Sequence, residues 1–411
     1  MSDELEKRDP YAAMRFRDFR LLISGRFIAQ IGEMMVSVAV GWELYERTGD
    51  AFALGLVGLV QVLPVMLLSV PGGYIADRYN RKWITLISQL VLVACSLALM
   101  AISLTKGSLP VLYGILALIG AARAFNNPAE SALTPQTVPP EYYFSAATWS
   151  SSVWQLSAIL GPAIGGLIIA ATKGAAWVYL VNALAGLVLV VTLLLLRSKQ
   201  TDYADLGETP WQSVRAGLSF VRNKQIILAS ISLDMFAVLF GGATFLLPVF
   251  AKDILHTDAT GLGILRAAPS IGALLMAVII ARRPPFTQAG KTLLWAVAGF
   301  GVATLIFGIS TSFWLSAAML FALGALDNIS VIIRHTVVLT QTPDAMRGRV
   351  NAVNSVFIGA SNELGGFESG VAAALLGPVG AVIFGAFGTL VVVGLTARFA
   401  PQLRDYGTLG T

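Results

Sequence analysis

The feature that most constrains the fold is a short charged link, residues 73–82, between two long apolar runs. The runs flanking its charges, residues 51–76 and 83–105, carry no charged side chain. As a helix, each run is long enough to cross a hydrocarbon core of about 30 Å. The link therefore predicts a tight turn between two membrane spans.

Similar apolar runs recur along all 411 residues, 56% of which are hydrophobic and only 12% charged. This composition is typical of a polytopic membrane protein. We expect an all-α membrane protein with twelve transmembrane helices in two pseudo-symmetric halves of six. The expected spans are at about 21–44, 52–75, 83–104, 109–132, 142–171, 175–196, 226–250, 260–281, 292–309, 314–338, 349–375 and 379–398.

A polar interval, residues 197–224, separates an N-terminal half (1–196) from a C-terminal half (225–411). Its second part could form an amphipathic helix on the membrane surface. The halves also share short identities about half the chain apart, which support a parallel repeat. Pro140-Glu141 recurs as Pro343-Asp344, and Gly120-Ala121 recurs as Gly324-Ala325.

The distribution of the 28 lysine and arginine residues predicts the orientation. Most of them fall on one side if both termini are cytoplasmic, as the positive-inside rule requires. The exceptions are Arg47, Lys106, Lys173 and Lys252 in outer links, and Arg26, Arg123 and Arg266 within spans. We expect a multi-pass protein of the cell (inner) membrane whose net charge of +5 faces anionic lipid rather than nucleic acid.

Several functional classes are disfavoured by what the sequence lacks. The chain has one cysteine and two histidines, too few for a disulfide framework or a structural zinc site. We therefore expect no metal and no cofactor. The sequence has no G-x-x-x-x-G-K-[ST] loop, which argues against direct use of ATP. No link is long enough for a soluble enzyme domain, and the N-terminal segment has no apolar stretch typical of a cleaved signal peptide.

Ionisable and polar groups inside the spans are the candidate site residues, because a charge at the bilayer centre costs about 2.5–3.5 kcal/mol. Such groups must face a wet cavity or a partner. When the halves are aligned, they fall in register, and we expect them to face a central cavity; the alternative is that some form structural ion pairs. The matched residues are Glu33 with Asp234, Gln61 with Arg266, and Arg123 with Asp327.

Seven-residue spacings add further candidates, because such residues lie two turns apart on one helix face. Arg26 precedes Glu33 by seven residues and could pair with it. Asp327 and Arg334 share this spacing, and His335 beside them is either a proton relay or a polar anchor at the interface.

Span 11 carries two carboxylates, Glu363 and Glu368. Five residues correspond to about 140° around a helix, so we do not expect both to face the cavity.

Two carboxylates are the expected proton-coupling residues, Asp234 and Glu33. Span 7 offers Asp234 no basic residue between Lys224 and Lys252, whereas Arg26 lies near Glu33 in the sequence. We therefore expect Asp234 to carry the proton and Glu33 to be available to a polar or cationic group of a substrate.

Glycines and a proline punctuate the fifth span at Gly161-Pro162 and Gly165-Gly166. Gly161 and Gly165 are four residues apart and so share one helix face, which predicts close approach of a neighbouring helix.

The charged link resembles the loop 2–3 pattern G-x-L-A-D-R-x-G-R-K of the major facilitator superfamily. Ile75 replaces its leucine and Asn80 its second glycine, and asparagine tolerates a left-handed turn. The glycine–proline stretch resembles the end of the superfamily's antiporter motif, although Val153 and Ser157 stand where that motif has glycines.

Further resemblance, to the drug:proton antiporter-3 branch, covers nearly the whole chain. That branch includes macrolide and siderophore exporters. The resemblance rests on Arg26-Phe27, on Gly41-Trp42-Glu43-Leu44-Tyr45, on Pro128-Ala129 through Leu133-Thr134-Pro135, on Leu246-Leu247-Pro248-Val249-Phe250, on Asp327-Asn328-Ile329-Ser330 and on residues 342–349.

The resemblance implies proton-coupled export of an amphipathic small molecule, siderophore-like or drug-like, by a monomer using alternating access. It also implies a conformational latch in the link, formed by Gly73, Asp77, Arg78, Arg81 and Lys82, in which Asp77 is held near the start of span 11 and by Arg81. A lysophospholipid transporter or flippase on the same fold, and a non-transporting membrane sensor, are the alternatives.

Overall fold

The computed structural model describes residues 11–197, 210–284 and 286–407. Part of the predicted polar interval, residues 198–209, lies outside this description, as do Lys7 and Arg8 of the N-terminal segment. Within the described ranges the chain is helical, with short 3-10 and π segments, and forms no strand. This agrees with the all-α fold predicted from the apolar runs.

The helices in the N-terminal part coincide closely with the first six predicted spans. They are η1 (Ala12–Arg15), α2 (Arg17–Thr48), α3 (Ala51–Arg78), α4 (Arg81–Thr105), α5 (Leu109–Leu133), η2 (Thr134–Thr137), η3 (Pro140–Tyr142), α6 (Tyr143–Thr172) and α7 (Ala176–Leu195).

The C-terminal part continues in the same manner. Its helices are α8 (Pro210–Asn223), α9 (Gln225–Phe240), η4 (Gly242–Leu246), α10 (Leu247–Val249), η5 (Phe250–Ile254), α11 (Ala259–Ala281), α12 (Ala289–Ile309), α13 (Phe313–Gln341), α14 (Asp344–Phe399) and α15 (Pro401–Arg404).

Eleven segments of the described chain are long and apolar enough to cross a membrane. The last of them, Met346–Phe399, lies within α14, a 56-residue element that joins two helices across a kink at Gly377. Gly377 has φ +76°, a conformation that glycine adopts without steric cost, and Pro378 follows it. The predicted spans at 349–375 and 379–398 meet at this kink.

The seventh predicted span is not one continuous α-helix. Its α-helical part, α9, ends at Phe240, and the chain continues through η4, α10 and η5. At the break, a Cβ atom on Gly242 would lie 2.5 Å from the Gly365 carbonyl oxygen of α14. The glycine therefore permits a close contact with α14 where the helix changes geometry.

The chain divides into two compact units. The first contains Met1–Glu43 and Leu63–Gly207, and the second contains Leu44–Val62 and Glu208–Thr411. The segment Leu44–Val62, which the sequence places in the first half, thus belongs to the second unit. It approaches α14 closely, because a Cβ atom on Gly55 would lie only 2.8 Å from the Gly370 Cα atom.

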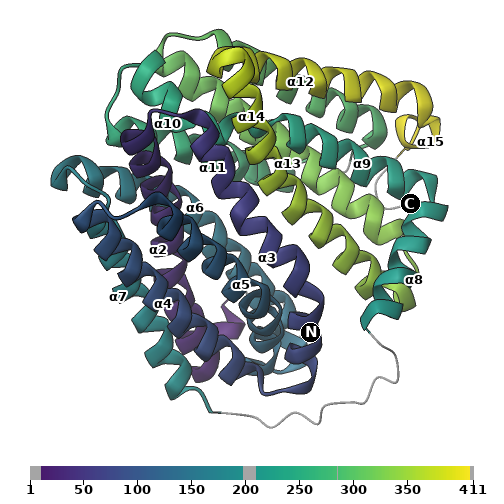
Figure 1. Cartoon of the computed structure of the whole chain (residues 1–411). Helices are drawn as coiled ribbons and strands as arrows, with labels where there is room; N and C mark the ends of the chain where they lie inside the picture. The colour runs from purple at the N-terminus through teal and green to yellow at the C-terminus, as the bar shows by residue number, and fades with distance from the viewer. Residues whose placement is uncertain (1–10, 198–209, 285, 408–411) are drawn as a thin grey trace. The chain divides into compact units, whose positions relative to one another are not determined.

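Within the first unit, α4 and α7 lie side by side (Figure 1). Their contact is close at Gly186, where a Cβ atom would lie 2.7 Å from a methyl group of Val93. A buried polar contact fixes the same pair of helices, since Asn182 Nδ2 donates to Ser96 Oγ at 2.7 Å. Small and polar residues therefore set this interface, as in other membrane helix pairs.

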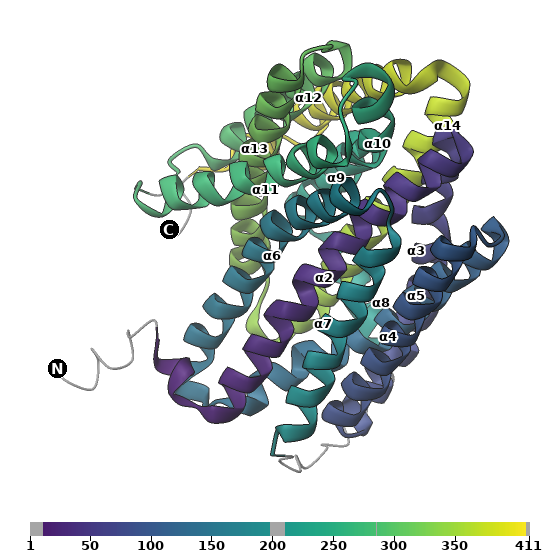
Figure 2. The same cartoon turned by 90° about the vertical axis from the view of Figure 1, so that its left-hand side faces the viewer.

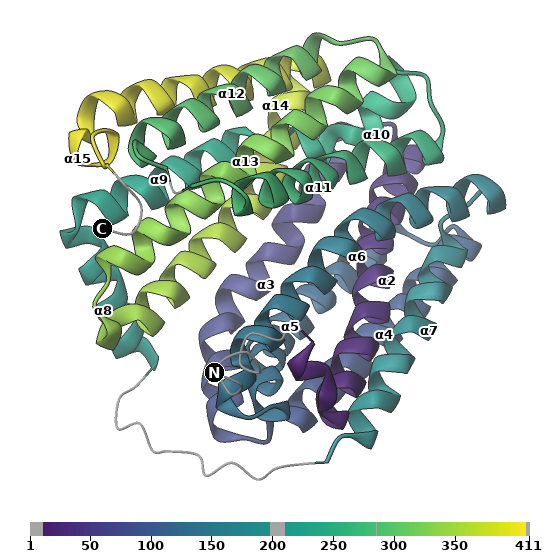
Figure 3. The same cartoon turned by 180° about the vertical axis from the view of Figure 1, so that it is seen from behind.

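In the second unit, α13 packs against both α11 and α12 (Figure 3). The α11 contact brings Gly324 against the backbone of Pro269, leaving no room for a side chain at the glycine. The predicted helix in the polar interval is present as α8, and its Gly217 packs against the Arg349 carbonyl of α14. One face of α8 is therefore covered by protein.

Candidate functional site

The first unit contains a polar cavity of about 330 Å³ between its helices. Two arginines and two glutamates line it, so its ionisable groups balance in charge. Amides and one indole ring complete the wall. The lining residues are Arg26, Ala29, Gln30, Glu33 and Met34 of α2, Gln89 of α4, Arg123, Asn126, Asn127, Glu130 and Ser131 of α5, Trp154 of α6 and Leu189 of α7.

The four charges form two ion pairs between α2 and α5. Arg26 Nε lies 2.7 Å from Glu130 Oε1, and Arg123 Nη2 lies 3.9 Å from Glu33 Oε2. Each helix carries an arginine followed seven residues later by a glutamate. Because these residues share a helix face and the helices run in opposite directions, each arginine meets the glutamate of the other helix.

The sequence predicted Arg26, Glu33 and Arg123 at this site but missed Glu130. The sequence does contain an indication of Glu130, because Glu130 follows Arg123 at the same seven-residue spacing that separates Arg26 from Glu33. Asn126 was also missed; its Nδ2 donates to Glu130 Oε2 at 3.1 Å. Its side-chain oxygen is buried and receives no hydrogen bond from the described residues, so an unsatisfied acceptor lies in the wall of the cavity.

The second unit contains a smaller charged cluster between α9 and α13. Asp234 forms an ion pair with Arg334, and both side chains are buried. Asp234 and Asp327 also line a cavity of about 10 Å³. The premise that Asp234 lacks a basic neighbour is therefore wrong: α9 supplies none, but α13 does.

The remaining matched pair, Gln61 and Arg266, falls in the second unit. Arg266 Nη1 donates to the Thr244 carbonyl oxygen at 3.0 Å and interacts electrostatically with Glu363. Glu368, five residues after Glu363, instead accepts a hydrogen bond from Ser369 Oγ at 3.4 Å. As the helical angle predicted, the two carboxylates of α14 have different surroundings.

His335 is exposed, whereas the preceding Arg334 is buried. Adjacent residues on a helix point about 100° apart, so the two side chains have different environments. The exposed position favours the polar anchor over the proton relay.

The link between α3 and α4 is as tight as predicted, with α3 ending at Arg78 and α4 beginning at Arg81. Asn80 does not use the left-handed conformation that asparagine tolerates: its φ is −63°, and its side chain accepts a hydrogen bond from the Lys82 backbone nitrogen. Asparagine is a favourable N-cap, so it starts α4 rather than replacing a flexible glycine.

Among the residues predicted to form a latch, Asp77 Oδ1 lies 3.8 Å from Arg81 Nη2. Arg81 also donates from Nε to the Ala76 carbonyl and from Nη1 to the Ala132 carbonyl of α5. The Arg78 guanidinium stacks over the Tyr74 ring at 4.5 Å. Gly73 has open space at its Cα, so packing does not require a glycine there.

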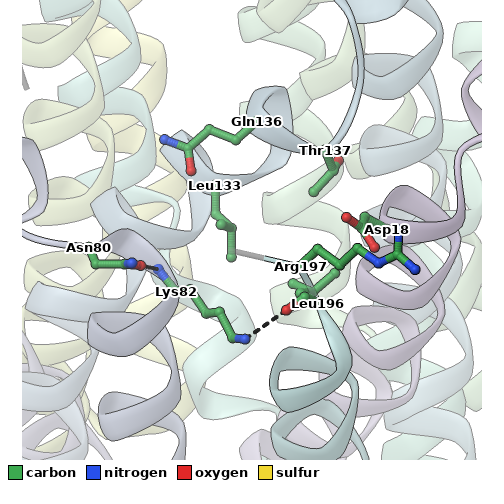
Figure 4. Close-up of a pocket in the computed structure, with 8 residues that line it drawn as sticks. All are labelled: Asp18, Asn80, Lys82, Leu133, Gln136, Thr137, Leu196 and Arg197. Carbon is green, nitrogen blue, oxygen red and sulfur yellow. Dashed lines mark hydrogen bonds between the residues drawn. The ribbon is translucent and has the colours of Figure 1, made fainter. Parts of the chain in front are cut away.

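Lys82 has a defined structural contact that the sequence did not reveal. Its Nζ donates to the Leu196 carbonyl oxygen at 2.7 Å (Figure 4). It also donates to the Leu194 carbonyl oxygen at 3.3 Å, so two carbonyl groups at the end of α7 gain a charged donor. A cation is favourable at a helix C-terminus, where carbonyl groups lack partners. Figure 4 also shows Asp18 and Arg197 beside this contact. Lys82 therefore ties the link to α7.

The glycine face of α6 packs against α2, as its spacing predicted (Figure 2). A Cβ atom on Gly165 would lie 3.1 Å from Met35 Cα, and one on Gly161 would lie 2.8 Å from the Ile31 carbonyl oxygen. Pro162 and Gly166 are buried in the same helix. This close contact helps to hold α2, and with it the arginine and glutamate that face the cavity.

A family model described as "Transmembrane secretion effector" matches residues 8–406 of this chain. The chain belongs to that family. The family is part of the major facilitator superfamily, so this protein is a multi-pass membrane transporter. The motif resemblance of the α3–α4 link is thereby confirmed at the level of the superfamily.

Individual relatives agree with this assignment. The chain is 26% identical over 392 residues to Enterobactin exporter EntS of Escherichia coli strain K12, covering 94% of this chain and 93% of the exporter. Enterobactin exporter EntS of Escherichia coli O1:K1 is equally similar, at 26% identity with the same coverage.

Solved transporters share the fold at low sequence identity. A bacterial homolog of the human lysosomal transporter Spinster, in an inward-facing and occupied conformation, matches with a TM-score of 0.74 and 13% identity over 96% of this chain and 99% of its own. A POT family transporter matches with a TM-score of 0.74 and 13% identity, covering 94% of this chain and 96% of that transporter.

Proposed function

We propose that this family member is a secondary active exporter that moves an amphipathic small molecule by alternating access in exchange for protons. The charge-balanced cavity of about 330 Å³ in the first unit carries this proposal. Charged groups are retained inside membrane spans at a substantial cost, and they are usually part of substrate or ion pathways.

The proposed topology has twelve spans. Eleven candidate segments are described, and α14 with 56 residues is about 80 Å long at 1.5 Å per residue. This length exceeds one hydrocarbon core more than twofold, so we assign two crossings that meet at Gly377. With both termini cytoplasmic, the basic α3–α4 link lies inside, in keeping with the charge distribution.

The proposed substrate is a siderophore-like molecule. Similarity to the enterobactin exporters suggests this class, and the cavity has suitable chemistry. Arg26 and Arg123 can donate to phenolate, carboxylate or carbonyl oxygens, and the Trp154 indole can stack on an aromatic ring. A substrate with several oxygens would compete with Glu130 and Glu33 for the two guanidinium groups.

The proposed cycle uses these ion pairs as its polar contacts. Oxygen atoms of the substrate would replace the glutamates as ion-pair partners of the two arginines. Exchange of partners keeps each guanidinium beside a negatively charged or polar oxygen and avoids a buried unpaired charge. The latch in the α3–α4 link would then stabilise one of the two conformations.

Flux measurements in proteoliposomes test this function. Purified protein is reconstituted in one predominant orientation, and uptake of labelled enterobactin is followed with and without an imposed pH gradient. We expect accumulation only when protons can move in the opposite direction, and loss of the gradient effect when an ionophore collapses the gradient. A protein that takes up enterobactin no faster than empty liposomes under either condition contradicts the proposed substrate.

Two other probes separate the remaining functions. Erythromycin tests a drug exporter, and a fluorescent lysophosphatidylethanolamine tests a lipid transporter in the same liposomes. Arg123→Gln should abolish movement of a true cavity substrate, whereas Lys291→Gln on α12, outside the cavity, should leave it unchanged. Movement of the lysolipid alone would replace the proposed export of a siderophore-like molecule.

A further inference from the structure

The two units place different charges at four corresponding positions. In the first unit these positions hold Arg26, Glu33, Arg123 and Glu130, with two positive and two negative charges. In the second unit, the corresponding positions on α9 and α13 hold Ile227, Asp234, Asp327 and Arg334. The first set is neutral when every group is ionised, whereas the second carries one excess negative charge.

The surroundings of the second set do not solvate that excess charge well. The cavity that Asp234 and Asp327 line has a volume of about 10 Å³, room for about one water molecule. Its wall from α12 is apolar, formed by Val297 and Phe300. Ile227, which replaces the first unit's arginine, is fully buried.

The only cation of this cluster is already engaged. Arg334 pairs with Asp234, and both side chains are at most 8% exposed. Among the described residues, no hydrogen bond or ion pair to the Asp327 carboxylate is found. The charged groups that act on Asp327 are Asp234, which repels its negative charge, and Arg334, which attracts it.

The other helices that pack on α13 offer Asp327 no further cation. On α11, Arg266 is directed to the Thr244 carbonyl and to Glu363. On α12, the charged residue is Lys291, and it acts on Asp405 near the C-terminal end of the described chain rather than on Asp327. Two carboxylates that share one cavity and one arginine cannot both stay ionised without a large cost, and binding of a single proton removes it.

We propose that the second unit binds one proton and that Asp327 holds it, while Asp234 remains ionised in its pair with Arg334. This inference deepens the proposed exchange of substrate for protons by naming the proton site, and its role in transport rests on that function. It replaces the expectation that Asp234 is the carrier. Asp234 becomes a positioning residue, because its charge fixes Arg334 and makes a second charge at Asp327 unfavourable.

Infrared difference spectroscopy can test proton binding without any substrate. The full-length protein in lipid is titrated between acidic and alkaline pH, and the C=O stretching band of protonated carboxylic acids is recorded. We expect one such band to disappear as pH rises. Asp327→Glu should shift the frequency of this band, because the longer acid changes its environment, whereas Asp234→Glu should leave the frequency unchanged.

Neutralising variants provide a second readout. Asp327→Asn should lack the band and keep the Asp234–Arg334 pair, so its elution profile and thermal unfolding should remain like those of the wild type. Asp234→Asn should also lose the band, because the arginine then balances Asp327. Unlike Asp327→Asn, it should be destabilised, because it separates a buried pair.

Transport is measured only after proton binding has been tested by infrared spectroscopy. In liposomes, Asp327→Asn should exchange enterobactin across the membrane but lose accumulation driven by a pH gradient. A wild-type protein that moves no probe refutes the proposed function and leaves the spectroscopic result standing.

Three outcomes would overturn the proton site itself. The first is the absence of a titrating carboxylic acid band, and the second is a frequency shift in Asp234→Glu but not in Asp327→Glu. The third is a band that Na⁺ abolishes at constant pH while K⁺ does not, since the excess charge would then bind a metal cation.

Discussion

Arg26 pairs with Glu130 of α5 and not with Glu33, seven residues further along its own helix. The sequence interval places Arg26 and Glu33 on one face, but seven residues also separate them by about 10 Å along the axis. That distance is too long for a direct ion pair. The common face therefore predicts a shared cavity, and the partner comes from the neighbouring helix.

A double-mutant cycle on Arg26 and Glu130 tests whether this pair acts as a unit. The side chains are only 22% and 13% exposed, so removing one leaves the other poorly solvated. We expect Arg26→Gln and Glu130→Gln each to destabilise the protein, and the double variant to lose less than the sum. The coupling should be on the order of 1 kcal/mol.

Thermal unfolding in detergent measures this coupling. The pair Arg123 and Glu33 is the matched control, because its 3.9 Å separation and greater exposure predict a smaller coupling energy. Additive effects at Arg26 and Glu130 would show that the close contact contributes no specific stability.

The glycine face of α6 gives a second prediction. Gly165→Leu forces a side chain into the backbone of Met35, so α2 must move away. We expect a destabilisation of about 1 to 3 kcal/mol, typical of overpacking, and a loss of most transport. Gly114→Leu on α5 is the matched control, because that glycine is exposed and has open space around it. Equal flux in both variants would contradict the packing.

These two sites show which features could be predicted from the sequence and which could not. The apolar runs and the glycine spacing predicted the helices and the α6 contact, because both depend on local periodicity. The partners of Arg26 and Asp234 depend on which helices become neighbours, and no single-helix pattern contains that information. The break after α9 was missed for the same reason, since Gly242 is required by the approach of α14.

The latch proposal predicts a loss of transport that is not a loss of stability. Asp77 is 60% exposed, so its ion pair with Arg81 should contribute only about 0 to 1 kcal/mol. We expect Asp77→Asn to keep wild-type expression and unfolding temperature but to transport far more slowly. Wild-type flux from purified Asp77→Asn would remove Asp77 from the mechanism.

Arg81→Ala should differ from Asp77→Asn in stability. Arg81 also donates to the carbonyls of Ala76 and Ala132, which the substitution leaves without these bonds. We therefore expect a lower unfolding temperature in addition to slow flux, and a double variant that transports no worse than Arg81→Ala.

Lys82 should act chiefly on structure. Lys82→Met removes the charged donor from the end of α7, where it contacts Leu196 and Leu194. We expect a destabilisation of about 1 to 2 kcal/mol, typical of hydrogen bonds with a charged partner. Lys82→Arg should recover most of it. A transport defect in Lys82→Met with unchanged stability would instead place Lys82 in the latch.

The variant Glu33→Gln tests whether Glu33 acts in substrate binding or in proton coupling. Its carboxylate borders the large cavity and is 27% exposed, and Arg123 is its ion-pair partner. Glu33→Gln keeps the shape of the side chain but removes the negative charge beside Arg123, so the polar contacts available to a substrate change.

We expect the KM for the transported probe to rise about tenfold in Glu33→Gln, equivalent to about 1.4 kcal/mol. Accumulation should still respond to a pH gradient, because in our proposal the proton binds at Asp327 in the second unit. Glu141→Gln at the exposed η3 segment is the matched control and should behave like the wild type. Proteoliposome flux with and without an imposed gradient decides between the roles. If Glu33→Gln exchanges its substrate normally but no longer responds to the gradient, Glu33 itself carries the proton and the charge-balanced first unit is the coupling site.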